Sequence, residues 1–420
     1  MQSSIEVAPS IDHLSPVSNT RRTIAIVLAG FCAFLDLHAP QPMLPELARA
    51  FHKSPGHISI LVTISTLAVA LAAPFVGHIS DRWGRKRIIV LSTLLLAVPT
   101  LLAATSTSFG QLVFWRFWQG LFTPGVFAVT VTYINEEWKR GAGAAMSAYV
   151  SGTVLGGFAG RSLAAVAAAY FAWQWAFVVL GALNVLGCIA IWHWLPKEGQ
   201  MGVRTSEGMA AAMWQHLRNP KLLATYAAGF CILFSLLGMF TYVNFYLSAP
   251  PFDLGTGALG LIFVVYLVGA GLTPLAGLWI DRLGHRVAFS GAMLLAIVGC
   301  LMTLSHHLVA VVAGLAIFCT GMFIGQSSAS SFIGTVSKNA KAAAVGLYVT
   351  SYYLGGSCGA AIPGATWSWG GWPACVGLMI ATCLATIVLV WLTCPNAKRF
   401  DHKRAFEAPE LRMAVTGSDD

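Results

Sequence analysis

The chain has 420 residues and a formal net charge of +9, with 57% hydrophobic and only 10% charged residues. Soluble domains contain roughly 25% charged residues, so this chain has too little polar surface to fold as a water-soluble protein of its size. Its positive charge does not indicate nucleic-acid binding, because no basic stripe with interleaved aromatic residues accompanies it. The composition therefore predicts an integral membrane protein.

Apolar segments long enough to cross a bilayer, which takes about 20 residues, follow one another along the chain. We expect twelve membrane-spanning helices, near residues 24–44, 58–79, 88–106, 110–133, 143–170, 174–195, 222–247, 258–280, 287–305, 308–333, 344–366 and 373–394. The polar stretch 196–221 divides them six and six, which predicts an all-α protein of two six-helix bundles. The expected divisions are a tail at 1–23, a bundle at 24–195, a linker at 196–221, a bundle at 222–394 and a tail at 395–420.

Positive charges are distributed unequally between alternate loops. If both termini are cytoplasmic, 21 of the 25 Lys and Arg residues lie in cytoplasmic segments, and only Arg49 and Lys53 lie in outer loops. Cytoplasmic loops of membrane proteins are enriched in these residues. The asymmetry therefore predicts a multi-pass protein of the cytoplasmic membrane with both termini inside.

The first span contains two candidate proton-coupling residues, Asp36 and His38. A carboxyl group or an imidazole within a span can bind and release a proton. Two residues that lie two positions apart on a helix differ by about 200° in direction, so Asp36 and His38 cannot both point squarely into one cavity. Gln41 follows His38 on the same helical stripe and is a candidate substrate contact. The choice between Asp36 and His38 stays open, because a histidine in a span can equally be a packing residue.

The loop after the second span has a distinctive sequence, Gly77-His-Ile-Ser-Asp81-Arg82-Trp-Gly84-Arg85-Lys86-Arg87. It resembles the loop signature of the major facilitator superfamily, G-x-x-x-D-R-x-G-R-K, and the resemblance extends over all twelve spans. It implies a secondary transporter that is not an enzyme, in which Gly77, Asp81, Arg82, Gly84 and Arg85 help to latch the cytoplasmic side shut. The alternative is that the basic residues only set topology and bind lipid headgroups.

Span 4 contains Arg116, and Gln119 lies on the same helical face. A charge within a span is costly and usually faces a wet cavity, so both residues are candidate substrate contacts, and Arg116 is also a candidate for proton coupling. The alternative is that Arg116 binds nearby carbonyl groups and only joins helices.

Span 5 contains a run of glycines that resembles the antiporter motif of the superfamily, with Gly157 where proline is usual and Arg161 where the last glycine is usual. The glycines should form a helix-packing face: Gly143, Gly152, Gly156, Gly157 and Gly160. The ending at Arg161, with the run Ser351 to Gly356, resembles the YnfM-like branch of bacterial inner-membrane transporters of the drug or sugar efflux type. Arg161 is a candidate substrate ligand, neutralised by a substrate carboxylate or phosphate or by Asp36; alternatively it binds backbone carbonyls or extends to the interface.

The second half repeats features of the first. The residues Pro274, Gly277, Asp281, Arg282 and Gly284 repeat a pattern 200 positions upstream, so Asp281 and Arg282 are further candidates for gating. The resemblance places the transport cavity among spans 1, 4, 7 and 10. It therefore makes substrate contacts of four residues in spans 7 and 10, Tyr242, Asn244, Tyr246 and Gln326.

These features predict alternating access of a small solute, with proton-coupled efflux of a drug-like compound or metabolite as the favoured function. Proton-coupled uptake of a sugar or organic acid is the alternative. The catalytic signatures HExxH and GxxxxGK[ST] are absent from the sequence. We expect no metal and no cofactor, and as partners only substrate, protons and the lipid bilayer, with a monomeric chain.

Overall fold

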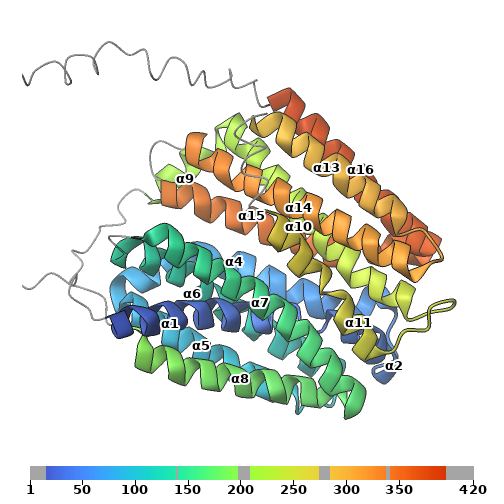
Figure 1. Ribbon diagram of the computed structural model, residues 1–420, viewed down its shortest axis with the longest axis horizontal. Coiled ribbons are helices and arrows are strands. Elements are labelled where there is room, and N and C mark those ends of the chain that lie inside the picture. Colours follow the sequence, from blue (N-terminus) through green and yellow to red (C-terminus); the bar gives the residue numbers. More distant parts are fainter. Residues whose placement is uncertain (1–15, 139–140, 197–208, 274–283, 337–340, 394–420) are drawn as a thin grey trace, which may run out of the picture.

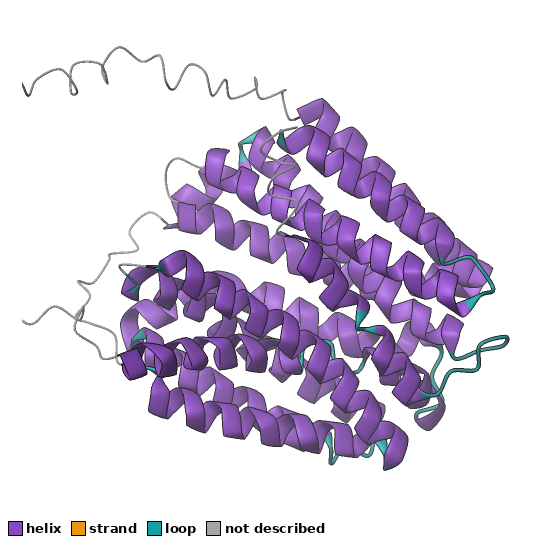
Figure 2. Cartoon of the chain, in the orientation of Figure 1, coloured by secondary structure: helices purple, strands orange, loops and turns teal. Residues whose placement is uncertain are grey.

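The computed structural model describes residues 16–138, 141–196, 209–273, 284–336 and 341–393. Every regular element within these residues is a helix, as Figure 2 shows. Asp281 and Arg282, and with them the second copy of the predicted gating loop, lie outside the described residues.

The helices of the first half begin with α1 (Pro16–Leu35), η2 (Gln41–Met43), α2 (Leu44–Ala50) and α3 (Pro55–Ile58). They continue with α4 (Ile60–Trp83), α5 (Arg85–Ala103), α6 (Phe109–Glu137), α7 (Ala142–Tyr170) and α8 (Trp173–Trp194).

The helices of the second half begin with α9 (Met209–Leu217), α10 (Pro220–Leu247) and α11 (Thr256–Ile262), which is followed by helical residues 265–273. They continue with α13 (His285–Met302), α14 (Leu308–Val336), α15 (Lys341–Ala361) and α16 (Pro363–Thr393).

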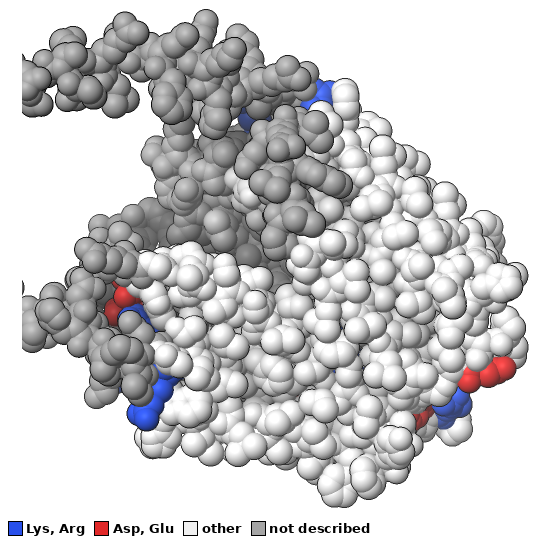
Figure 3. All heavy atoms as spheres, in the orientation of Figure 1, with Lys and Arg blue, Asp and Glu red and all other residues white. Residues whose placement is uncertain are grey.

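Nine helical segments within the described residues are long and apolar enough to cross a membrane. The three remaining predicted spans coincide with α1, α6 and α15, which are helices but are richer in charged, polar or small residues. On the face shown in Figure 3, the described Lys, Arg, Asp and Glu side chains lie towards the two ends of the molecule, with an uncharged band between them. This is the surface that a bilayer requires.

The helices pack as two groups, one from each half of the chain (Figure 1). In the first group α1 packs on α7, and α4 and α5 pack on α6; in the second, α10 packs on α15 and α13 on α14. We call the end of the molecule where α1 begins the proximal end. The distal end is the opposite one, which contains the connections 104–108, 171–172 and 248–255.

Glycines bring equivalent helix pairs of the two groups into close contact. A Cβ atom at Gly152 or Gly156 would overlap the carbonyl oxygen of Val27 or Phe31, so α7 lies directly against the backbone of α1. Gly355 and Gly359 meet the carbonyls of Phe230 and Phe234 in the same way, which brings α15 against α10. Both glycines and both of their partners lie 203 positions after their counterparts, so the sequence repeat corresponds to a structural repeat.

Two of the predicted packing glycines do not meet another helix. A Cβ atom at Gly143 would have no neighbouring atom within 4 Å, and one at Gly157 would meet only the side chain of Arg161. Gly143 lies in the first turn of α7, before the helix approaches α1. The helix-packing prediction is therefore wrong for these two residues, whereas Gly160 packs on the carbonyl of Leu35.

The first predicted span is not one continuous helix. Regular helix ends at Leu35, residues 36–40 form turns, and η2 and α2 follow. The segment contains Pro40, Pro42 and Pro45, which have no backbone N–H to donate and disfavour helix in the residue before them. The break places Asp36 and His38 on non-helical backbone.

Candidate functional site

A cavity of about 170 Å³ lies between the two helix groups. The first group lines it with Phe34 and His38 at the end of α1 and with four residues of α7: Thr153, Val154, Gly157 and Arg161. The second group lines it with six apolar or aromatic residues: Leu233, Leu236, Leu237, Tyr266, Phe323 and Tyr352. The cavity is therefore mainly apolar, with a guanidinium group and an imidazole at its wall.

Arg161 is held by neutral groups rather than by a carboxylate. Its Nε donates to Gln41 Oε1 at 2.8 Å, and its Nη1 donates to the Gly157 carbonyl at 2.7 Å. Its guanidinium carbon also lies 4.9 Å and 4.7 Å from the ring centroids of Phe263 and Tyr266. Among the described residues no carboxylate forms an ion pair with it. The hypothesis that Asp36 neutralises Arg161 is therefore wrong for this conformation.

Asp36 and His38 face opposite sides of the turn that follows α1. The Asp36 carboxylate points into the first helix group, where it accepts hydrogen bonds from Thr100 at 2.9 Å and from Asn184 at 2.5 Å. His38 lines the cavity, is only 7% exposed, and its Nε2 has no hydrogen-bond partner among the described residues. The prediction that the two side chains cannot share one cavity is confirmed, although the backbone between them is not helical.

Arg116 is completely buried and does not line the cavity. Its guanidinium donates to the backbone carbonyls of Leu61, Asp36 and Leu37, and it also contacts the Gln119 side chain. Gln119 in turn donates to Thr100 at 2.8 Å. In this conformation Arg116 and Gln119 hold the broken end of α1 on α4 and α6, which is the alternative that the sequence left open for Arg116.

The four candidates from the second half also lie outside this cavity. The Tyr242 hydroxyl lies 3.0 Å from the Ala360 carbonyl oxygen, and Asn244 donates to Phe240 within its own helix. Tyr246 stacks on Trp372, with ring centroids 5.3 Å apart, and Gln326 accepts from Tyr348. Each side chain is engaged in packing or capping here. The second half instead lines the cavity with Tyr266, Phe323 and Tyr352, which carry no polar signature that the sequence could distinguish from core residues.

Five hydrogen bonds join the two helix groups at the distal end. The donor–acceptor distances are 3.3 Å from Gln41 to Thr241, 3.1 Å from Tyr242 to Ser59, 3.1 Å from Ser357 to Thr63, 3.2 Å from Ser162 to Gly260, and 2.9 Å from Thr256 to Glu46. Gln41 also accepts from Arg161, so one of these bonds begins at the cavity wall. The two groups are thus closed against each other on the distal side of the cavity.

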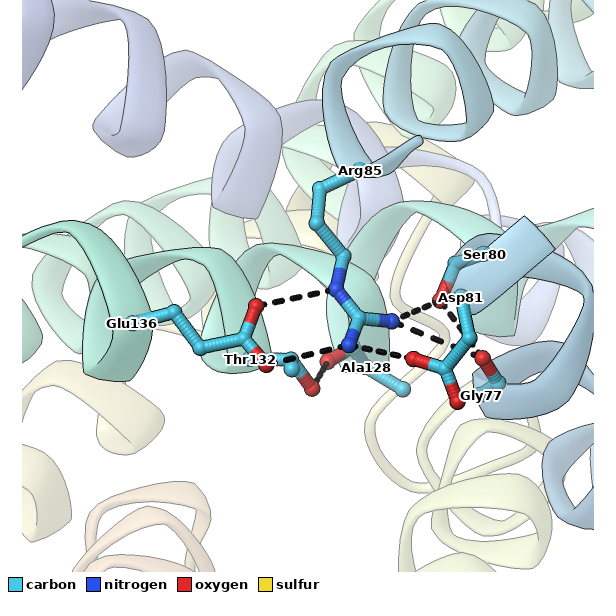
Figure 4. A network of polar contacts seen from close by, with 7 residues as sticks. All are labelled: Gly77, Ser80, Asp81, Arg85, Ala128, Thr132 and Glu136. Atoms are coloured by element: carbon cyan, nitrogen blue, oxygen red, sulfur yellow. Dashed lines mark hydrogen bonds and ion pairs between the residues drawn. The ribbon is translucent and has the colours of Figure 1, made fainter. Parts of the chain in front are cut away.

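The predicted gating loop forms a network at the proximal end, shown in Figure 4. Arg85 lies 2.5 Å from the Asp81 carboxylate and makes two 3.0 Å hydrogen bonds to Glu136, while its Nη1 contacts Gly77 and Ser80. Gly84 has φ of 91°, which allows the tight reversal between α4 and α5. The network joins α4, α5 and α6 of a single helix group. Sequence reasoning missed Glu136, although two adjacent glutamates at the end of span 4 are a visible signal.

Two members of the gating loop make no side-chain contact within this network: Gly77 takes part only through its backbone carbonyl, and Arg82 takes no part. Arg82 is exposed, and Gly77 is exposed with no atom within 4 Å of a Cβ built on it. The latch role expected of these two residues stays a prediction.

A match to a protein-family model identifies the family of this chain. The model described as Major Facilitator Superfamily matches residues 26–325 and again 251–414. This chain belongs to the major facilitator superfamily. It is 33% identical over 373 residues to the inner membrane transport protein YnfM of Escherichia coli, covering 88% of this chain and 89% of YnfM. It is 31% identical to the uncharacterized MFS-type transporter YybF of Bacillus subtilis, covering 88% and 92%.

Solved structures share the fold of this transporter at low sequence identity. A bacterial homologue of the human lysosomal transporter Spinster has a TM-score of 0.71 at 15% identity, covering 90% of this chain and 96% of that one. The nucleoside transporter NupG has a TM-score of 0.73 at 12% identity, covering 89% and 100%. Membership of the superfamily, with YnfM and YybF as relatives, makes the protein a secondary transporter of small solutes with many membrane spans, and not an enzyme.

Proposed function

We propose that this transporter exports a drug-like compound or metabolite across the cytoplasmic membrane in exchange for protons. The observation that supports this most directly is the cavity between the two helix groups, which both groups line. Transporters with repeated halves bind substrate at such an interface and expose it to each side in turn as the halves rock. In the present state the distal hydrogen bonds keep one side closed.

Orientation in the membrane follows from the charge distribution. The described basic residues Arg82, Arg85, Lys86 and Arg87 lie at the proximal end, in the last turn of α4 and the first turn of α5. The positive-inside rule then puts the proximal end and both termini in the cytoplasm, with the distal hydrogen bonds on the outer side. Because the relative YnfM is an inner membrane protein of Escherichia coli, we propose the inner membrane for this chain too.

Asp36 is the better candidate for the coupling proton. Its carboxylate is buried, its two hydrogen-bond donors are neutral, and its Oδ1 has no partner among the described residues. Arg116 donates to the backbone carbonyl of Asp36 rather than to its carboxylate. A proton on Asp36 would alter its bonds to Thr100 and Asn184, and so the turn that presents His38 to the cavity and Gln41 to Arg161. His38 is the alternative proton site.

Luminal pH in proteoliposomes tests antiport against uptake by symport. Proteoliposomes that contain the reconstituted protein enclose the pH dye pyranine, and no pH gradient is imposed. Cationic drugs, sugars and carboxylates are then added outside the vesicles, one at a time. Antiport makes the lumen more alkaline when substrate enters, whereas proton symport makes it more acidic. Protein-free liposomes correct for passive permeation of weak acids and bases. Acidification with every active compound would reject antiport, and no response to any compound would reject proton coupling.

The Asp36→Asn variant tests the coupling site in the same vesicles. We expect it to lose the luminal pH change while it still exchanges labelled for unlabelled substrate, because the substrate cavity itself is intact. His38→Gln should keep both. A pH change that persists in Asp36→Asn and disappears in His38→Gln would transfer the proton role to His38.

A further inference from the structure

The cavity wall contains one fixed charge among its described lining residues, the guanidinium of Arg161. Arg161 is only 3% exposed, yet Gln41, Gly157 and two aromatic rings are its described partners, and all of them are neutral. A buried cation without a counter-ion is costly, since hydrogen bonds and ring contacts replace only part of its hydration. The site is therefore electrostatically incomplete and would gain from an anion.

Arg161 also has a donor available for such an anion. Nε and Nη1 make the two hydrogen bonds described above, and Nη2 makes none with the described residues. His38 lines the same cavity, lies within electrostatic range of Arg161, and has an Nε2 without a partner among the described residues. Two nitrogen atoms on one wall can bind the two oxygen atoms of a carboxylate.

The remaining walls favour an apolar body on the same ligand. Phe34, Leu233 and Leu237 are apolar, and Tyr266, Phe323 and Tyr352 add three aromatic rings. A cavity of about 170 Å³ has room for on the order of ten water-sized groups, at roughly 10–15 Å³ each. This corresponds to a compound of one aromatic ring with a short substituent.

We propose that the substrate is a small amphipathic monoanion, a carboxylate on an aromatic or branched apolar body, bound by Arg161 and His38. The proposal rests on the proposed function of the cavity as the substrate site. A dianion such as a phosphate monoester would leave one negative charge unbalanced against the single guanidinium. A cationic compound would meet a like charge, so both classes should bind more weakly than the monocarboxylate.

Equilibrium binding to the purified protein in detergent tests this inference without any proton gradient. The probes are benzoate, phenylacetate and indole-3-acetate, each compared with its own neutral amide, together with phenyl phosphate and phenethylamine. Calorimetry should give an affinity at least tenfold higher for at least one carboxylate than for its amide, phenyl phosphate and phenethylamine. No preference for any carboxylate, or absence of carboxylate binding, would overturn the proposal.

Two variants identify the residue responsible. Gln41→Glu places a carboxylate against Arg161 without loss of volume, and Arg161→Gln removes the charge; both should abolish the preference for carboxylate over amide. Arg49→Gln removes an exposed cation outside the cavity and should leave the preference unchanged. Melting temperatures show that each variant is folded. A preference that survives in Gln41→Glu and Arg161→Gln would overturn the assignment to Arg161.

Two substitutions at His38 form a matched pair of variants. His38→Gln retains a donor and should keep most of the carboxylate preference, whereas His38→Leu should reduce it. Equal preference in wild type and His38→Leu would exclude His38 from the site. A cationic drug that changes luminal pH while no carboxylate binds would leave proton-coupled transport standing and overturn only the substrate class.

Discussion

The buried side chain of Arg116 holds the end of α1 against α4 and α6. It donates to the carbonyls of Asp36, Leu37 and Leu61. The carbonyls of Asp36 and Leu61 also accept from Ala39 and Ser65, whereas that of Leu37 has no other donor among the described residues. Arg116→Leu removes all three bonds and leaves the Leu37 carbonyl unsatisfied, at roughly 1–3 kcal/mol for such a buried group. We expect a loss of about 2–4 kcal/mol in stability, measured as a lower melting temperature and a lower folded yield in detergent.

Arg116→Lys is the matched control for geometry. Lysine keeps the charge but is a point donor and cannot span three carbonyl groups. Its stability should therefore lie between wild type and Arg116→Leu. If Arg116→Leu melted at the same temperature as the wild type, the structural role would be contradicted. Arg116 would then again be a candidate substrate contact.

Sequence patterns singled out buried polar residues of the first half but not the directions in which all of them point. Asp36, His38, Gln41, Arg116 and Arg161 all belong to the cavity wall or to the network behind it. Which of them faces the cavity depends on the turn at residues 36–40, whose geometry the prolines predict only as a break. The cavity-lining Phe34, Leu233 and Tyr352 could not be distinguished from core residues, because apolar side chains look alike in a hydrophobic span.

Gly156 sets the separation of α1 and α7. Its Cα lies so close to the backbone of Phe31 that a methyl group would overlap the carbonyl oxygen. Gly156→Ala should force the helices apart at a cost of about 1–3 kcal/mol, as in overpacked cores, and lower the melting temperature. Gly359→Ala should do the same to α10 and α15, because its position repeats that of Gly156.

Gly143→Ala is the control for this pair. The position lies on the same helix, but a Cβ there meets nothing within 4 Å. Alanine is also the better helix former, so the variant should be neutral or slightly stabilising. Equal melting temperatures for Gly143→Ala and Gly156→Ala would show that close backbone contact is not what the motif provides.

The Arg85 network fixes the proximal ends of α4, α5 and α6. Arg85 binds Glu136 through two parallel hydrogen bonds, and both side chains are largely buried. A double-mutant cycle with Arg85→Gln and Glu136→Gln should give a coupling energy of about 1–2 kcal/mol in unfolding measurements. Arg85→Lys should recover only part of it, since lysine cannot form the paired geometry. Additive effects of the two glutamine variants would contradict a direct interaction.

Hydropathy predicts some element limits closely, and three departures from the prediction have identifiable causes. Span 5 was predicted at 143–170 and α7 runs from Ala142 to Tyr170. The first span ends early because three prolines follow it. Span 8 is interrupted at residues 263–264, and a short helix, α9, lies within the predicted polar linker. Hydropathy averages over windows and so misses interruptions of one or two residues.

At the scale of the whole molecule, alternating access requires the two helix groups to separate at the distal end. The groups meet there through side-chain hydrogen bonds and through close contact of α7 with α11, where Ala169 faces Gly257. A Cβ atom built on Gly257 lies 3.4 Å from the Cβ of Ala169, close to the separation that a disulfide requires. A covalent bond at this point would hold the distal side closed.

The double variant Ala169→Cys with Gly257→Cys tests whether this contact opens during transport. Both positions are accessible rather than buried, so an oxidant should form the disulfide readily. Oxidation should reduce turnover in proteoliposomes at least tenfold, because the cross-linked helix groups cannot separate. A reductant should restore it. Each single variant, treated with the same oxidant, controls for the native cysteines and should remain active. Full turnover in the cross-linked protein would exclude separation of α7 from α11 as part of the transport cycle.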